Sequence, residues 1–133
     1  METITLITGG NKGIGRETAR RLKEAGHTVL IGARDPERGR AAADELGVGL
    51  LHLDITDQAG VDEAAARVRA EHGRLDVLVN NAAVNSVVAP LEQTTAEDAA
   101  AVLDANVLGA LRVTNAFLPL LRDSQHARIV NVS

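Results

Sequence analysis

The chain has 133 residues, a length that fits one domain with its own hydrophobic core. Its composition, 45% hydrophobic and 24% charged, excludes a long disordered tail, and the absence of cysteine excludes disulfides and thiolate catalysis. A net charge of −4 and a single aromatic residue, Phe117, disfavour nucleic acid and anionic membrane as partners. We find no secretion signal and no run of about 18 apolar residues, and therefore expect a cytoplasmic protein.

Short β-branched runs alternate along the chain with longer stretches of helical periodicity. Strands are predicted at residues 3–8, 28–33, 49–53, 75–79 and 128–132. Helices are predicted at about 14–25, from Pro36 to near Gly47, at about 59–71, and at 96–121 after a cap at Thr94 or Thr95. Pro119 is a candidate position for a kink.

The fourth strand carries the clearest information about the fold. The run LDVLVN is apolar on both faces, which is typical of a parallel sheet covered by helices. In the first helix we expect a buried stripe of Ile14, Thr18, Leu22 and Ala25. The repeated β-α pattern predicts an open, doubly wound α/β sheet of five strands in a single domain, residues 1–133.

A glycine-rich turn, TGGNKGIG at residues 8–15, connects the first strand to the first helix. Such a turn directs backbone N–H groups and the positive end of the helix to one point, where a phosphate can bind. The turn lacks the Gly-Lys-Ser/Thr ending of ATP- and GTP-binding P-loops, and its glycine spacing is related to, but differs from, the dinucleotide fingerprint. The alternative is a tight connection without a ligand.

The second strand ends in Arg34, followed by Asp35. In dinucleotide-binding sheets an acidic residue here contacts ribose hydroxyls, whereas an arginine accommodates a 2′-phosphate. Lys12 adds a second cation in the glycine turn, so the two side chains favour NADP over NAD. The alternative is that Arg34 and Asp35 form a solvated pair in a turn.

Six segments together resemble the short-chain dehydrogenase/reductase family, and within it the carbonyl reductases. They are TGGNKGIG at 8–15, GARD at 32–35, LDIT at 53–56, LDVLVNNAA at 75–83, the Asn106–Gly109 segment and RIVNVS at 128–133. The resemblance implies a Rossmann fold and an NAD(P)-dependent oxidoreductase, which transfers hydride between nicotinamide and a small carbonyl or alcohol substrate.

The resemblance also implies a set of site residues. The cofactor-binding residues are Gly9, Asn11, Lys12, Gly13, Ile14 and Gly15 at the pyrophosphate and adenosine ribose, Arg34 at the 2′-phosphate, Asp54 and Ile55 at the adenine, and Asn80, Asn81 and Ala82 at the nicotinamide-side ribose. Asn106 is implied as a catalytic residue in a distorted helix that holds a water. Judged from the residues alone, Asp54 is also a candidate helix cap and Asn106 a candidate core asparagine. Ala83 replaces the glycine usual in the family.

The tyrosine and the lysine that complete catalysis in the family have no counterpart in this sequence. The chain has no tyrosine, and its only lysines are Lys12 and Lys23. We therefore expect the N-terminal part of a longer enzyme, able to bind dinucleotide but inactive alone, with the fifth strand as an apolar edge. The helix at 96–121 is a candidate homo-oligomer interface, and its Val113, Phe117 and Leu121 are expected to lack packing partners.

Two alternatives to the enzyme remain open at this stage. One is a dinucleotide-binding module that senses or regulates, and the other is a sheet that binds a different adenosine ligand, such as a methyl donor. The four histidines are scattered over different elements, so we predict no metal site.

Overall fold

The computed structural model describes residues 2–84 and 90–132, and its five strands form one parallel sheet in the order β3-β2-β1-β4-β5. The doubly wound α/β fold is thus confirmed, and each strand end lies within two residues of its predicted position. The strands are β1 (Ile4–Thr8), β2 (Thr28–Ala33), β3 (Gly49–His52), β4 (Val77–Asn80) and β5 (Arg128–Asn131). β5 forms an edge of the sheet.

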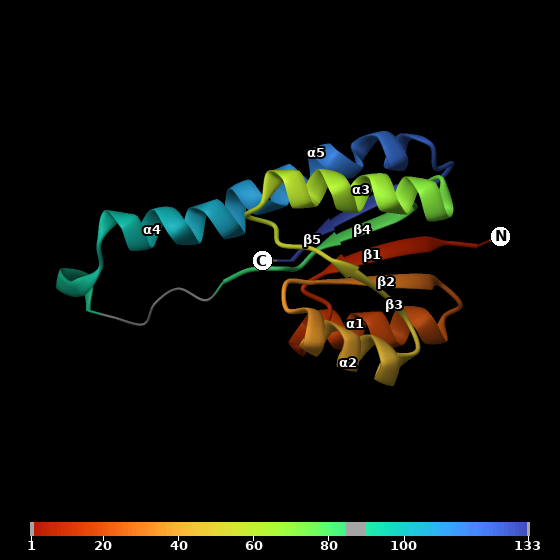
Figure 1. The fold of residues 1–133 in the computed structure, drawn as a ribbon, viewed down its shortest axis with the longest axis horizontal. Coiled ribbons are helices and arrows are strands. Elements are labelled where there is room, and N and C mark those ends of the chain that lie inside the picture. The colour runs from red at the N-terminus through yellow and green to blue at the C-terminus, as the bar shows by residue number, and fades with distance from the viewer. Residues whose placement is uncertain (1, 85–89, 133) are drawn as a thin grey trace.

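Helices cover both faces of this sheet (Figure 1). On one face lie α1 (Gly13–Glu24) and α2 (Pro36–Leu46), and on the other lie α3 (Gln58–His72) and α5 (Gly109–Arg122). The 3-10 turn η1 (Leu91–Gln93) precedes α4 (Ala96–Leu103), which is joined to α5 by a π-helical turn, η2 (Asp104–Leu108). In Figure 1, α4 projects beyond the layered body.

Two buried clusters hold the layers together because side chains alternate between the faces of each strand. Ile4 and Leu6 of β1 pack with Val61, Val68 and Phe117 under α3 and α5. Ile7 of β1 packs on the opposite face with Ile31 of β2 and with Ala19, Ala42 and Ala43 of α1 and α2. Each cluster therefore fixes one helical layer onto the sheet.

The buried face of α1 differs from the predicted stripe. Gly15 and Ala19 are buried, whereas Ile14 is 68% exposed and Ala25 is also exposed. The reason is a close approach, because a Cβ at Gly15 would lie 2.5 Å from the carbonyl oxygen of Gly9. Only small residues fit where this helix meets the sheet, and the larger Ile14 is left outside.

The expectation that the end of the long helix lacks partners is wrong. Val113 and Phe117 are fully buried and Leu121 is 2% exposed, because α5 packs against α3 and β4. The predicted cap at Thr95 is confirmed. Its hydroxyl accepts from the Asp98 backbone N–H, and the Asp98 carboxylate accepts from the Thr95 backbone N–H. The interruption lies at η2, and α5 continues through Pro119.

The stretch Ala96–Arg122 is long and apolar enough to span a membrane by length and composition, contrary to our sequence expectation. One such helix is weak evidence of a membrane span, because a core helix satisfies the same criterion. In its second half, Val113, Phe117 and Leu120 lie in the core under the sheet.

The carboxylate of Asp76 joins three elements at the amino ends of the strands. It accepts from the Ile4 backbone N–H at 2.8 Å, from the Ser124 hydroxyl at 2.6 Å, and from Arg74 Nε at 3.1 Å. Burial raises the pKa of this carboxyl, but the hydrogen bonds from Ile4, Ser124 and Arg74 outweigh it, and the net pKa is lowered. The ionised form therefore stabilises the fold.

We expect Asp76→Asn to lower the free energy of unfolding by about 1–3 kcal/mol at pH 7. A group whose pKa is depressed in the folded state contributes stability above its unfolded pKa, near 4, and loses it as pH falls through the folded value. The difference between wild type and variant should therefore shrink between pH 5 and pH 2, a window of about three units. Urea unfolding across this range measures it.

Asp44→Asn is the matched control, because Asp44 pairs with Arg40 at 3.5 Å on the exposed face of α2. We expect it to change stability by less than about 0.5 kcal/mol. A deficit in Asp76→Asn that is equally large at pH 7 and at pH 2 would contradict the assignment.

Candidate functional site

The candidate site is a cavity of about 520 Å³ beside the carboxyl ends of the strands. β1 pairs with both β2 and β4, so the order of the strands reverses between β1 and β4. Open α/β sheets bind ligands at such a point. Most of the predicted cofactor-binding residues line the cavity: Gly9, Asn11, Lys12, Gly13, Ile14, Arg34, Asp54, Ile55, Asn81 and Ala82. Gly15, Asn80 and Asn106 are not among the lining residues.

The glycine turn brings its backbone close to the opposite wall. Gly9 has a φ of 64°, and a Cβ there would lie 2.9 Å from the Cα of Ala82. Gly13 also has a positive φ, 57°, and a Cβ there would meet open space. Within the described residues no side chain caps α1, and its first turn carries no acidic residue. The N–H groups at this helix start therefore remain available to an anion.

Three cations border the same cavity: Lys12, Arg34 and Arg38. Arg38 was not found from the sequence, although its position four residues after Arg34, in the first turn of α2, was a usable signal. Asp35 caps α2 by accepting from the backbone N–H of Glu37 at 2.9 Å and of Arg38 at 3.2 Å. The structure thus favours a helix cap over a solvated Arg34–Asp35 pair as the role of Asp35.

Asp54 lies just beyond β3 and organises the turn that follows. Its Oδ1 accepts from the Thr56 hydroxyl at 2.7 Å and from the Thr56 backbone N–H at 2.9 Å. The hydrogen bonds from Thr56 lower the pKa of Asp54, and the charge of Arg34 adds to the effect. The N-cap of α3 is Asp57, so Asp54 shapes the turn and not the helix start. Both hydrogen bonds use Oδ1, and the second oxygen remains for a donor in the cavity.

The buried hydroxyl of Thr8 connects the ends of β1 and β4. It accepts from the backbone N–H groups of Asn81 and Ala82, each at 2.9 Å. Asn81 Nδ2 donates to the Gly9 carbonyl at 3.1 Å, which fixes the glycine turn to the same segment. Thr8 was absent from the predicted site. The signal that could have identified it is that Thr8 ends its strand, as the two consecutive asparagines end the strand that pairs with it.

Asn80 connects β4 to its other neighbours. Its Nδ2 donates to Asn131 Oδ1 at 2.9 Å and to Thr114 Oγ1 at 3.1 Å. Its Oδ1 is buried and has no partner among the residues that the structure describes. The two asparagines therefore join neighbouring segments. Asn81 lines the cavity, and Asn80 does not.

Asn106 lies in η2, so the distorted helix implied by the resemblance is present. Its side-chain amide holds the backbone of Val84 twice: Oδ1 accepts from Val84 N at 2.8 Å, and Nδ2 donates to Val84 O at 3.0 Å. The residue is exposed and therefore not a core asparagine. Its neighbour Ala105 lines the cavity in its place.

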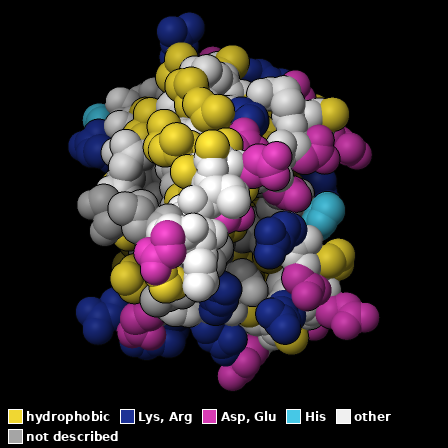
Figure 2. Space-filling view, turned by 90° about the vertical axis from the view of Figure 1, so that its left-hand side faces the viewer, with side chains coloured by type: hydrophobic (Ala, Val, Ile, Leu, Met, Phe, Trp, Pro, Cys, Tyr) yellow, Lys and Arg dark blue, Asp and Glu magenta, His cyan; other side chains and the backbone are white. Residues whose placement is uncertain are grey.

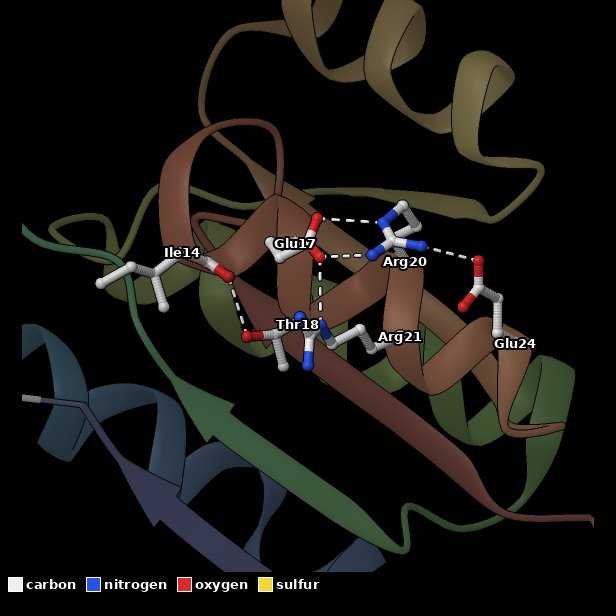
Figure 3. A network of polar contacts seen from close by, with 6 residues as sticks. All are labelled: Ile14, Glu17, Thr18, Arg20, Arg21 and Glu24. Atoms are coloured by element: carbon white, nitrogen blue, oxygen red, sulfur yellow. Dashed lines mark hydrogen bonds and ion pairs between the residues drawn. The ribbon is translucent and has the colours of Figure 1, made fainter.

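A smaller hollow of about 360 Å³ lies between α1 and α2. Several of its charged side chains pair with one another: Arg20 binds both Glu17 and Glu24 (Figure 3). These pairs are exposed to solvent, where ion pairs contribute little to stability. We therefore assign the site to the larger cavity. No cluster of three potential metal ligands occurs within residues 2–84 and 90–132.

Figure 2 looks onto the end of the molecule from which α4 projects. Hydrophobic side chains gather in the upper part of this view, and several Lys and Arg side chains in the lower part. Exposed apolar residues of the α4–α5 helix are Leu103, Val107, Leu108 and Leu111, each 45–57% exposed. One end of the molecule therefore combines an apolar helix surface with a region of mixed charge (Figure 2).

Comparison with known proteins agrees with this architecture. Residues 3–133 match the family model for short chain dehydrogenases. The NADP-dependent 3-hydroxy acid dehydrogenase YdfG of Salmonella typhi is 36% identical over 131 residues, which are 97% of this chain and 53% of that protein. The chain thus spans about half the length of the curated relatives it matches.

Solved structures show the same likeness. The Pseudomonas aeruginosa RhlG/NADP complex superimposes with a TM-score of 0.92 at 36% identity, covering 97% of this chain and 53% of that one. A short-chain dehydrogenase of Shigella flexneri in complex with NADP gives a TM-score of 0.92 at 29% identity, covering 98% and 58%. With its five-stranded parallel sheet and this match over nearly its whole length, the chain belongs to the short-chain dehydrogenase family of oxidoreductases.

Proposed function

We propose that residues 1–133 are the cofactor-binding unit of an NADP-dependent oxidoreductase, which transfers hydride between nicotinamide and a small carbonyl or alcohol substrate. One observation carries the proposal: Lys12, Arg34 and Arg38 border the same cavity as the uncapped start of α1. The relatives named above are described as NADP-dependent or were solved with NADP.

The donor set of the cavity fits this cofactor. The backbone N–H groups at Gly13 and Ile14 suit a pyrophosphate, because the helix start supplies partial positive charge. Lys12 and Arg34, with Arg38 beside them, suit a 2′-phosphate, since cations form charge-assisted hydrogen bonds with its oxygens. The ionised Asp54 suits the adenine amino group as an acceptor, with Ile55 against the ring.

The remaining residues act at the nicotinamide end in this proposal. When bound, NADPH supplies the hydride. Asn81 and Ala82 line the cavity and suit the nicotinamide-side ribose, and Asn80 binds Asn131 of the neighbouring strand. A π-helical turn changes the regular backbone hydrogen-bond pattern, and we propose that η2 at Asn106 thereby holds a water for proton transfer.

If Arg34 binds the 2′-phosphate, Arg34→Ala should weaken NADPH binding roughly 10- to 100-fold and leave NADH binding within about twofold. The reason is that NADH lacks the phosphate that the guanidinium recognises. Titration by calorimetry or by nicotinamide fluorescence measures both affinities.

Arg40→Ala is the matched control, because Arg40 lies on the same helix as Arg38 but pairs with Asp44 on its outer face. It should change neither affinity. Equal binding of NADPH and NADH by the wild-type chain would rule out the role of Arg34, and binding of neither would rule out the proposed cofactor.

The sequence contains no tyrosine to protonate the substrate oxygen, and so we expect the 133-residue chain to bind NADPH without catalysing reduction. Incubation with NADPH and a reactive diketone, followed at the nicotinamide absorbance, should show no oxidation above the protein-free rate. Rapid turnover by this chain alone would show that another group donates the proton.

We further propose that the helix at 96–121 forms a homo-oligomer interface, since Leu103, Val107, Leu108 and Leu111 leave an apolar surface exposed. Val107→Glu combined with Leu111→Glu should convert an oligomer into a monomer in sedimentation experiments. Ala66→Glu, on the exposed face of α3, is the control and should leave the mass unchanged. A monomeric wild type would contradict this interface.

The cytoplasmic location stays a prediction.

A further inference from the structure

Two segments that are distant in sequence both contribute to the cavity lining. Ile55 belongs to the loop between β3 and α3, and Val84 follows β4. Both line the cavity, together with Ala105 of η2. A ligand that contacts both segments requires a fixed separation between them.

The π-helical turn and the residue that caps it contact both segments. On one side, Gly109, the C-cap of η2 and the first residue of α5, packs so closely on Ile55 that an added Cβ would lie 2.8 Å from its side chain. On the other side, the side-chain amide of Asn106 binds both the N–H and the carbonyl of Val84. η2 therefore bridges the two cavity segments, and its own position determines their separation.

A single guanidinium holds η2 in this position. Nη1 of Arg112 donates to the Ile55 carbonyl at 3.1 Å and to the Asp104 carbonyl at 3.1 Å, and Nη2 pairs with the Asp104 carboxylate. The Arg112 side chain is 21% exposed, so these charge-assisted contacts are partly shielded from water. The planar fork of arginine allows one side chain to bind all three oxygens at once.

We propose that Arg112 is a positioning residue for the cofactor cavity. It fixes η2 to the Ile55 loop and, through Asn106, sets the position of Val84. The functional consequence rests on the proposed NADP binding. A ligand that spans both segments depends on Arg112 at two places. A ligand that contacts only the Ile55 loop and the cations Lys12, Arg34 and Arg38 keeps its contacts with the cations and is affected less.

Arg112→Met tests this with two independent readouts. Hydrogen exchange at the Val84 amide should become faster by about fivefold or more, because its acceptor, Asn106 Oδ1, is no longer held in place. The variant should also bind NADPH about fivefold or more weakly, while its affinity for 2′,5′-ADP stays within about twofold. A general loss of structure would weaken both ligands equally.

Arg122→Met is the matched control, because Arg122 is an exposed arginine at the end of the same helix, and it should change neither readout. Arg112→Lys retains the charge without the planar fork, so it should show the same pattern in weaker form if Arg112→Met does not fold. Unchanged exchange at Val84, or equal weakening of both ligands, or faster exchange with unchanged NADPH affinity, would overturn the proposal.

Failure of the proposed function gives a different result. If the wild-type chain binds neither NADPH nor 2′,5′-ADP, NADP binding is refuted. Hydrogen exchange at Val84 alone then decides whether Arg112 positions η2 and Val84. Faster exchange in Arg112→Met would support the role of Arg112 in positioning η2 and Val84, and unchanged exchange would overturn that role.

Discussion

The hydroxyl of Thr8 joins the two strand ends between which the candidate cavity opens. β1 and β4 are neighbours in the sheet although three helices and two other strands separate them in sequence. By accepting from the N–H groups of Asn81 and Ala82, Thr8 satisfies backbone donors that leave the regular ladder at this point. The glycine turn, the asparagine segment and the cavity all depend on this junction.

Close approach is the second constraint, and it explains where small residues occur. Gly9 lies against the backbone of Ala82, Gly15 lies against Asn81 and Gly9, and Gly109 lies against Ile55. Each contact removes the room for a side chain and brings backbone from two elements together. The chain thereby builds a cavity bordered by backbone N–H groups at the same place where Lys12 and Arg34 supply charge.

Polar contacts at the two ends of the sheet have different purposes. At the amino ends, Asp76 uses its carboxylate for the Ile4 N–H, Ser124 and Arg74, and it does not line the candidate cavity. At the carboxyl ends, Asp54 uses one oxygen for Thr56 and lies on the cavity. The first carboxylate stabilises the fold, and the second is available for binding.

The sequence by itself determined the strands, the order of the helices and the glycine turn that borders the cavity, because these depend on local periodicity, caps and turn chemistry. Only the tertiary structure decided which residues meet. It placed Arg38 on the cavity, buried Phe117, left Ile14 exposed, and put the helix interruption at η2 instead of Pro119. Contacts such as Arg112 with Ile55 join residues far apart in the chain, and no local pattern encodes such a contact.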